Sequence, residues 1–180
     1  MKRSSEQVWD EYLVLNAQLG NQAALRRLIE RHQAALLVYI QRLLGNEADA
    51  QDVLQNSLLS CCRQINRLRD PARFRAWLYR VATNQCRDWQ RQSYRQRERQ
   101  VALDQVLPTL SAEENPAEDD VRSILIRLPH DDRSILSLFY FEGFSVKELS
   151  FALDLSPSAV KTRLYRARAR FDALWRDDEG

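Results

Sequence analysis

The feature that most constrains the fold is the stretch 144–171, which has the pattern of two short helices joined by a tight turn. The first helix is indicated by three apolar residues at helical spacing, namely Val146, Leu149 and Leu153. Ser145 comes just before them and Glu148 follows three residues later, which is the pattern of a capping box at a helix N-terminus. The pattern therefore predicts a capped helix with one buried face.

The second half of this stretch begins with an independent helix signal. Aspartate tolerates the left-handed backbone of a tight turn, so the turn is predicted at Asp154. Ser156 then suits an N-cap, and Pro157 suits the first helical position, where a missing amide costs no hydrogen bond. Val160 and Leu164 lie four residues apart and are predicted to face inward.

The outward face of this second helix is basic. Residues 155–171 carry five basic side chains and no acidic one. A helix-turn-helix presents its second helix to the DNA major groove, where hydroxyl and guanidinium groups read base edges and flanking cations bind phosphates. The side chains predicted to face outward are Ser158, Lys161, Thr162, Tyr165 and Arg166. The stretch favours DNA binding over its plainer alternative, a helical hairpin with a solvated basic face.

Composition points to an all-α protein with room for one domain or two small ones. The 180 residues include only four glycines and five prolines, and period-two runs of β-branched residues are missing. No apolar run has the length of a membrane span and the amino terminus has no secretory h-region, so we expect no membrane insertion and a cytoplasmic location. Cys61, Cys62 and Cys86 lack metal-ligand spacing, and we expect reduced core cysteines and no metal site.

Opposite charges are segregated along the chain, although its net charge is only +2. Residues 63–100 carry eleven arginines against three acidic side chains, and residues 101–120 carry six acidic side chains and no basic one. The stretch 155–171 forms the second basic region. Two separate basic surfaces on a nearly neutral protein predict a polyanion that is held at two places.

Three helices are predicted before residue 69, at about 6–19, 22–44 and 47–68. The candidates for the inward face of the first helix are Val8, Trp9, Tyr12 and Leu13. The third helix carries a stripe of mainly small residues that is predicted to be buried, namely Ala50, Val53, Ser57, Cys61 and Ile65. A second stripe consists of Asp52, Gln55, Asn56 and Leu59. It is either a solvated face with one stray leucine or a docking face with a polar rim, and the pattern leaves both open.

An arginine-rich helix follows the turn 69–73 and is predicted from Phe74 to Arg91, or as far as Arg99. Its predicted core side consists of Phe74, Trp77, Leu78, Val81 and Ala82. Its predicted outward side consists of Arg75, Arg80, Asn84, Arg87, Asp88 and Arg91. Cations of this kind track a phosphate backbone, and nearby aromatic rings stack on exposed bases. The alternative is that Trp77 and Trp89 are core anchors.

The acidic segment divides the chain into two predicted domains. Residues 101–118 lose helical periodicity after Leu110 and contain two prolines, so we expect a flexible linker with at most a short helical turn near 103–107. The first helical domain would then cover residues 1–100 and the second residues 119–180. Within the second, helices are expected at about 120–128 and 132–141, before the helix-turn-helix.

Three blocks of sequence together resemble a known family, the extracytoplasmic-function sigma factors of the sigma-70 family. They are DAQDVLQNSLL from Asp49, FRAWLYRVATNQCRDWQR from Phe74 and EGFSVKELSFALDLSPSAVKTRLYRARARF from Glu142. Their order and spacing across most of the chain are more specific than any one block. The resemblance implies a bacterial initiation factor with two helical domains that directs core RNA polymerase to promoters.

The resemblance also implies roles for individual residues. One set would bind core RNA polymerase, through its β′ and β subunits: Asp49, Asp52, Gln55, Asn56 and Leu59. A second set would recognise and melt the minus-ten promoter element: Leu68, Arg73, Trp77, Arg80, Asn84, Arg87 and Arg91. A third would read the minus-thirty-five element: Ser158, Lys161, Thr162, Arg163, Tyr165 and Arg166. The resemblance further implies promoter DNA and an anti-sigma factor as partners.

The chain departs from the family pattern at a few positions. Gln51 and Asn56 stand where the family usually has glutamate, so the docking face carries less negative charge. Ser150 stands where alanine or glycine is common, and Asp154 where glycine is common.

Two other classes of protein are weaker interpretations. A self-sufficient helix-turn-helix regulator that binds DNA as a dimer leaves the helix of arginines and tryptophans unexplained. A recombinase or other enzyme would need a catalytic cluster. Because no nucleophile–base pair, carboxylate pair or phosphate-binding glycine loop is found, we expect no enzymatic activity, no catalytic residues and no cofactor.

Overall fold

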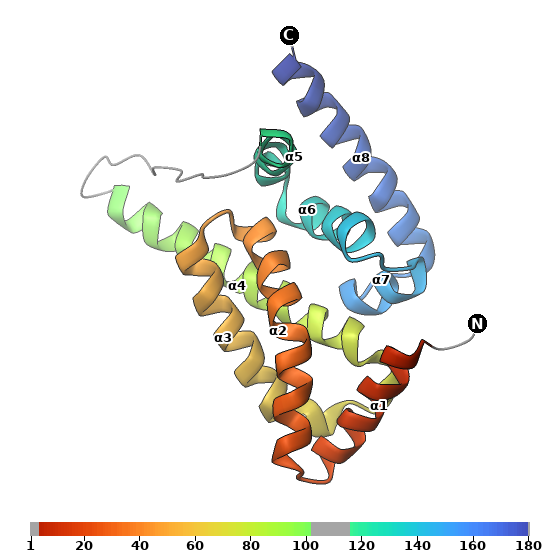
Figure 1. Ribbon diagram of the computed structural model, residues 1–180. Coiled ribbons are helices and arrows are strands. Elements are labelled where there is room, and N and C mark those ends of the chain that lie inside the picture. The colour runs from red at the N-terminus through yellow and green to blue at the C-terminus, as the bar shows by residue number, and fades with distance from the viewer. Residues whose placement is uncertain (1–3, 102–115, 180) are drawn as a thin grey trace.

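The computed structural model describes residues 4–101 and 116–179, and every regular element within these ranges is helical (Figure 1). The elements are α1 Ser5–Gln18, α2 Gln22–Leu44, α3 Glu47–Gln64, η1 Ile65–Arg67, η2 Pro71–Arg73, α4 Phe74–Val101, α5 Pro116–Arg127, α6 His130–Leu136, η3 Ser137–Phe141, α7 Val146–Leu153 and α8 Pro157–Glu179. The predicted all-α class is thereby confirmed. No helix within the described residues combines the length and the apolar character of a membrane span.

Helices α1 to α4 form the first helical group, with α2 packed against the other three and α3 against α4. The fully buried side chains of α2 lie at its centre, namely Leu28, Leu36, Tyr39, Ile40 and Leu43. The small-residue stripe of α3 is confirmed, since all five of its members are buried. The hydroxyl of Ser57 donates to the Val53 carbonyl at 2.7 Å, which satisfies a polar group that would be costly to bury alone.

Helix α1 has apolar residues on two opposite faces, and this corrects the predicted inward face. Leu13 and Ala17 are buried, but the side chains of Val8 and Tyr12 are 52% and 54% exposed, and Trp9 is 41% exposed. Successive residues turn by about 100° around a helix, so Val8 and Tyr12 point away from Leu13. Helical periodicity alone does not distinguish two apolar faces of one helix.

Polar contacts select the face of α1 that packs. Gln18 donates to the carbonyls of Ile65 and Leu68 at 2.9 and 2.8 Å. Asp10 accepts from Arg31 and lies 2.9 Å from His32 Nε2, both on α2. These contacts join residues far apart in the sequence, so they orient α1 in a way that no local pattern indicates.

Helices α5 to α8 form the second helical group, in which α5, α6 and α7 all contact α8. The helix-turn-helix is formed as predicted. Ser145 and Glu148 make the reciprocal capping box, and Asp154 takes the left-handed conformation with φ of 56°. The Ser156 hydroxyl caps α8 by accepting from the Ala159 amide at 3.2 Å, and Val160 and Leu164 are buried.

Within the second group, the prediction differs from the structure at two places before the helix-turn-helix; in the first group, the helix predicted at 47–68 ends at Gln64 and is followed by the short turn η1. Helix α5 begins at Pro116 instead of near residue 120, so its first turn falls within the predicted linker. The helix predicted at 132–141 is α6 followed by one π-helical turn, η3, in which the Glu142 amide donates to the Ser137 carbonyl at 3.2 Å. The short helical turn predicted near 103–107 lies outside the described residues.

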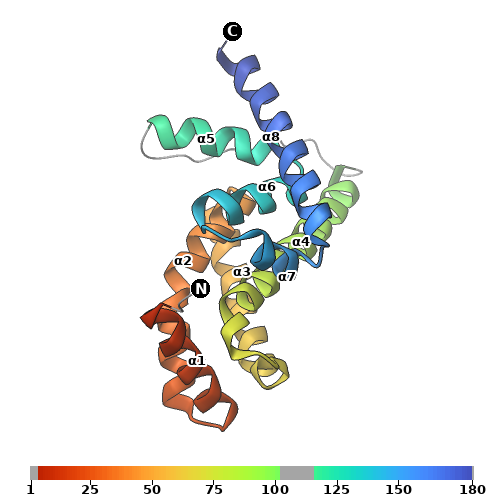
Figure 2. The same cartoon turned by 90° about the vertical axis from the view of Figure 1, so that its right-hand side faces the viewer.

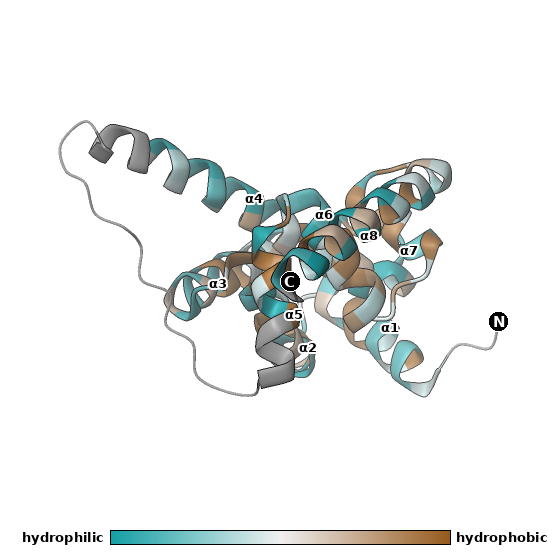
Figure 3. Cartoon of the chain, turned by 90° about the horizontal axis from the view of Figure 1, so that it is seen from above, coloured by the Kyte–Doolittle hydropathy of each residue, from teal (hydrophilic) through white to brown (hydrophobic). Residues whose placement is uncertain are grey.

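The two helical groups pack directly against each other. Helix α4 contacts α7, while the second half of α2 contacts α5 and α6 (Figures 1 and 2). Gly45 ends α2 with φ of +76°, and a Cβ there would lie 2.7 Å from Ile126 of α5. The left-handed backbone is what favours glycine here, because the close atom is the end of the Ile126 side chain, which can move. The second half of α4 extends beyond the packed helices, and the part of it that is coloured in Figure 3 is hydrophilic.

Candidate nucleic-acid interface

One arginine-rich surface lies on α4. Asn84 and Arg91 are exposed, and Arg80 and Arg87 are half-buried. Trp77 is also half-buried and packs on the core beside Phe74, with ring centroids 6.1 Å apart. The Trp77 ring therefore serves as a core anchor in this structure, and the cations around Asn84 form the outward face.

The segment before α4 is held in place by its own polar contacts. Leu68 is only 6% exposed, so its side chain packs into the core and does not face solvent. Its carbonyl accepts a hydrogen bond from Gln18, which also holds the segment in place. Asp70 caps η2 by accepting from the Ala72 amide at 3.2 Å, and it binds Arg73 at 3.0 Å. The Arg73 guanidinium also lies 5.1 Å from the Phe151 ring centroid on α7.

The second arginine-rich surface lies on α8. Ser158, Lys161, Thr162, Tyr165 and Arg166 are exposed as predicted. Together with Arg163 and Arg170, several of them line a depression of about 570 Å³ that also includes Asp131 and Asp132. The depression lies between α8, the second helix of the helix-turn-helix, and the start of α6, and its arginines are suited to bind a phosphate.

Asp131 lies between the two arginine-rich surfaces. A second depression, of about 490 Å³, is lined by Arg87, Arg91, Tyr94 and Arg95 of α4, and it shares Pro129 and Asp131 with the first. Asp131 accepts from Arg87 at 2.8 Å and lies 3.4 Å from Arg163 Nη1. Burial alone would raise the pKa of Asp131, but the hydrogen bond from Arg87 and the charges of both arginines lower it.

The polar stripe of α3 is exposed, which agrees with both interpretations given above, a solvated face and a docking face. Asp52, Gln55 and Asn56 face solvent, and Leu59 is 46% exposed. Asp49 is half-buried in the first turn of α3, where Asn46 caps the helix. The stripe is therefore not part of the core.

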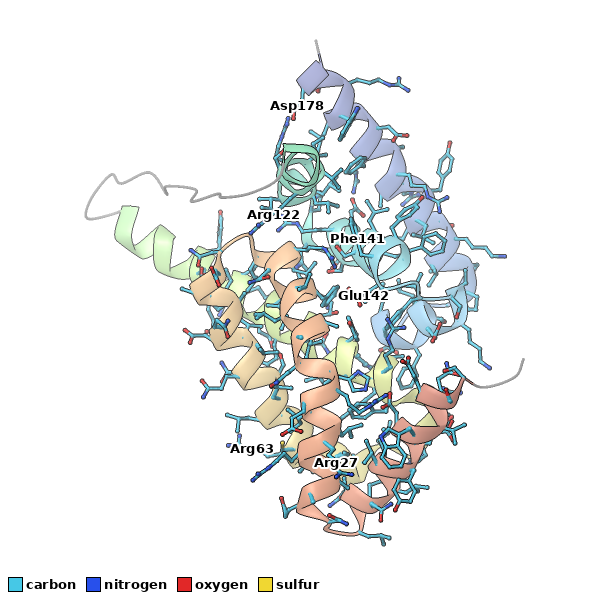
Figure 4. The ribbon with its side chains drawn as sticks, viewed as in Figure 1. Arg27, Arg63, Arg122, Phe141, Glu142 and Asp178 are labelled. Carbon is cyan, nitrogen blue, oxygen red and sulfur yellow. The ribbon has the colours of Figure 1, made fainter. Side chains whose placement is uncertain are left out.

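A buried carboxylate that sequence reasoning missed joins the two groups. Glu142 is 9% exposed at its side chain, and its Oε2 accepts from the Tyr79 hydroxyl at 2.5 Å. Its Oε1 accepts from Arg42 at 3.1 Å, and its carbonyl accepts from Arg75 at 2.6 Å. Figure 4 shows Glu142 and its neighbour Phe141 where the second group meets α2. Glu142 follows the predicted helix 132–141 directly and stands beside Gly143, so no sequence pattern indicated its burial.

A buried arginine was missed as well. Arg133 of α6 donates to the carbonyls of Leu43, Ile126 and Leu128, and so caps the C-terminal ends of α2 and α5. Burial lowers the pKa of Arg133 to about 10, which leaves the guanidinium charged at neutral pH. No group of three or more potential metal ligands is found among the described residues.

A partly buried histidine, His130, is expected to make the stability of the fold sensitive to acid. It begins α6, its Nε2 lies 3.3 Å from Ser134 Oγ, and burial lowers its pKa to about 4, with the Arg87 charge acting in the same direction. The ordinary pKa is 6.5, so an unfolded chain takes up this proton first as pH falls. We expect the free energy of unfolding to be constant above pH 6.5 and to drop by roughly 2 kcal/mol by pH 4.5. Urea unfolding at several pH values measures it.

His130→Gln is the matched variant for this measurement, because it keeps a polar side chain that does not titrate. Its stability should be nearly flat between pH 6.5 and 4.5. Asp10 and Asp131 contribute little within this window, since their pKa values are lowered and the stability that they provide is lost mainly as pH falls below their ordinary value of 3.8. Equal pH dependence in both proteins would show that His130 is not the responsible group.

Comparison with known proteins identifies both helical groups. Residues 28–97 match the family model for Sigma-70 region 2, and residues 118–171 match the one for Sigma-70, region 4. The ECF RNA polymerase sigma-E factor of Salmonella typhimurium is 29% identical over 93% of this chain and 95% of its own length. The solved structure of CnrH, in complex with the cytosolic domain of CnrY, is 30% identical and has a TM-score of 0.71 over 94% of this chain and 99% of that one.

A second solved structure is similar in fold. The sigma factor RpoE of Bartonella quintana, in complex with the anti-sigma factor NepR, is 19% identical and has a TM-score of 0.69 over 84% of this chain and 96% of that one. The fold and the two arginine-rich surfaces thus define a two-part helix-turn-helix protein of transcription. The chain belongs to the extracytoplasmic-function group of the sigma-70 family of RNA polymerase sigma factors.

Proposed function

We propose that this chain directs core RNA polymerase to promoters through three separate surfaces. The α3 stripe binds the polymerase, the outward face of α4 recognises and melts the minus-ten element, and the outward face of α8 reads the minus-thirty-five element. The observation that carries the proposal is that each matched sigma-70 region contains one of the two exposed arginine-rich surfaces.

Strand separation follows from binding energy alone. Asn84 is exposed among Arg80, Arg87 and Arg91, and its amide both donates and accepts hydrogen bonds. In the proposed open complex it holds an unstacked base while the arginines bind the flanking phosphates, and this capture offsets part of the unpairing cost. The proposed mechanism requires no covalent bond to be made or broken by the chain.

The proposed partners follow from the same roles. They are promoter DNA and core RNA polymerase, through its β′ and β subunits, so the proposed place of action is the cytoplasm. An anti-sigma factor is included because a protein of similar fold, RpoE of Bartonella quintana, was solved in complex with one. The proposed division of the chain is region 2 in residues 1–100, a linker in 101–118, whose last three residues form the start of α5, and region 4 in 119–180.

Reversing the character of the α3 stripe tests polymerase binding. Asp52→Arg with Leu59→Asp replaces an exposed acid by a base and an exposed apolar contact by a charge. We expect loss of co-elution with core polymerase and of run-off transcription, because the variant places a repulsive charge and an unpaired buried charge in the proposed interface. The melting temperature should stay nearly unchanged, since surface substitutions seldom change stability by more than about 0.5 kcal/mol.

The matched control is Glu30→Arg with Leu15→Asp, which makes the same charge changes at exposed positions of α2 and α1. This variant should bind polymerase like the unchanged chain. Retention of polymerase binding by the α3 variant would remove the docking role. A footprint on promoter DNA by the chain alone would instead favour a self-sufficient regulator.

A further inference from the structure

We propose that the free chain holds itself closed through two carboxylates of its second helical group, Glu142 and Asp131. Glu142 locks the two groups together, and Asp131 takes the place of a DNA phosphate between one arginine of each arginine-rich surface. This inference rests on the proposed function, because it concerns the same DNA-binding faces.

Glu142 bonds the second helical group to the first. Its side chain is almost fully buried and meets Arg42 from α2 together with Tyr79 from α4, while Arg75 binds its carbonyl. The Arg75 guanidinium also lies 4.5 Å from the Phe144 ring centroid, and Phe144 is buried. One residue of the second group therefore satisfies three donors from two helices of the first.

Asp131 binds two arginines in the way that a DNA phosphate would. Its Oδ1 binds Arg87 of α4 and its Oδ2 faces Arg163 of α8, so one carboxylate holds cations from both proposed DNA-binding helices. Guanidinium groups bind phosphate and carboxylate oxygens with the same geometry. A DNA phosphate at either arginine therefore competes with Asp131 for the same donor.

A third contact places the helix-turn-helix over the minus-ten face. Arg80 lies 3.4 Å from Asp154, the left-handed residue of the turn, and its guanidinium lies 5.9 Å from the Phe151 ring centroid on α7. Helix α7 therefore covers α4 on the side that carries Arg80.

The closed arrangement is incompatible with a promoter held at both elements. By their names the two elements are separated by about 25 base pairs, which is on the order of 80 Å along B-DNA. Helices α4 and α7 are in direct contact in the closed chain. The groups must separate for both elements to be bound at once, so breaking the contacts of Glu142 and Asp131 is a cost that promoter binding has to meet.

Small-angle X-ray scattering of the free full chain tests this without polymerase or DNA. We compare the unchanged chain with Glu142→Gln combined with Asp131→Asn, which keeps side-chain volume and removes both charges. We expect a compact unchanged chain and a larger radius of gyration for the double variant. The charge-matched control is Asp177→Asn combined with Glu30→Gln, which removes two negative charges from exposed positions and should stay compact.

Binding to a promoter duplex gives a second readout. Asp131→Asn alone should raise the affinity of the free chain for the duplex about tenfold, since the two arginines no longer need to be released from a carboxylate. If the double variant fails to fold by circular dichroism, Tyr79→Phe replaces it, because it removes only the hydroxyl that binds Glu142. That variant should show a smaller expansion.

The outcomes separate the lock from the proposed function. Equal radii of gyration in the unchanged chain and the folded lock variants, whether both are compact or both expanded, would overturn the lock. Expansion of the variants supports the lock even if no variant of this chain supports transcription, in which case the proposed function fails by itself.

Discussion

Replacing Lys161 and Arg166 together with alanine should lower transcription from a minus-thirty-five-dependent promoter by at least about thirtyfold. Both side chains are exposed on the outward face of α8. Each good contact with a base edge discriminates by about 1–3 kcal/mol, and two such losses multiply in rate or affinity. The helix itself should persist, because its packing depends on Val160, Leu164 and Ala167, which are buried. Run-off transcription with core polymerase measures the loss.

The control for this prediction is Lys147→Ala with Arg176→Ala. It removes the same positive charge from exposed positions outside the proposed reading face. If both double variants lose activity equally, the effect is general attraction to a polyanion. If the first variant transcribes every promoter normally, α8 is not the reader.

Arg133→Met should lower the free energy of unfolding by about 2–5 kcal/mol. The methionine keeps much of the side-chain volume but donates nothing to the carbonyls of Ile126 and Leu128, and a buried acceptor without a partner costs about 1–3 kcal/mol. The Leu43 carbonyl suffers less, because Gln90 also donates to it at 3.2 Å. Urea unfolding followed by circular dichroism gives the value.

Arg127→Met provides the comparison, since Arg127 at the end of α5 is exposed and pairs with Asp178 at the surface. Exposed ion pairs contribute about 0–1 kcal/mol, so this variant should unfold nearly like the unchanged chain. Similar losses in the two variants would mean that the buried contacts of Arg133 contribute little.

The parts of the fold that the sequence predicts are those fixed by neighbouring residues. The capping box of Ser145 and Glu148 and the left-handed turn at Asp154 depend on contacts within a few residues. The buried stripe of α3 has a regular helical period, so its five members were found together. The exposed face of α8 followed from the same spacing.

The parts that escaped prediction depend on contacts between distant residues. Arg133 contacts Leu43, and Glu142 contacts Arg42, across about half of the chain. A charged side chain in or just after a predicted helix is expected to be solvent-exposed until the partner that buries it is known. The same reason explains the inward face of α1, which the polar partners of Gln18 and Asp10 select.

The π-helical turn η3 makes the position of Glu142 depend on the number of residues between Leu136 and Gly143. Such a turn holds one residue more than an α-helical turn of the same path. Deleting one residue between Ser137 and Phe141 would leave a regular helix and rotate everything after it by about 100°. Glu142 would then turn away from Arg42 and Tyr79 with its identity unchanged. Among relatives of this chain, the spacing between Leu136 and Gly143 is thus as informative as the presence of a glutamate, and a single insertion is enough to create or erase the contact in evolution.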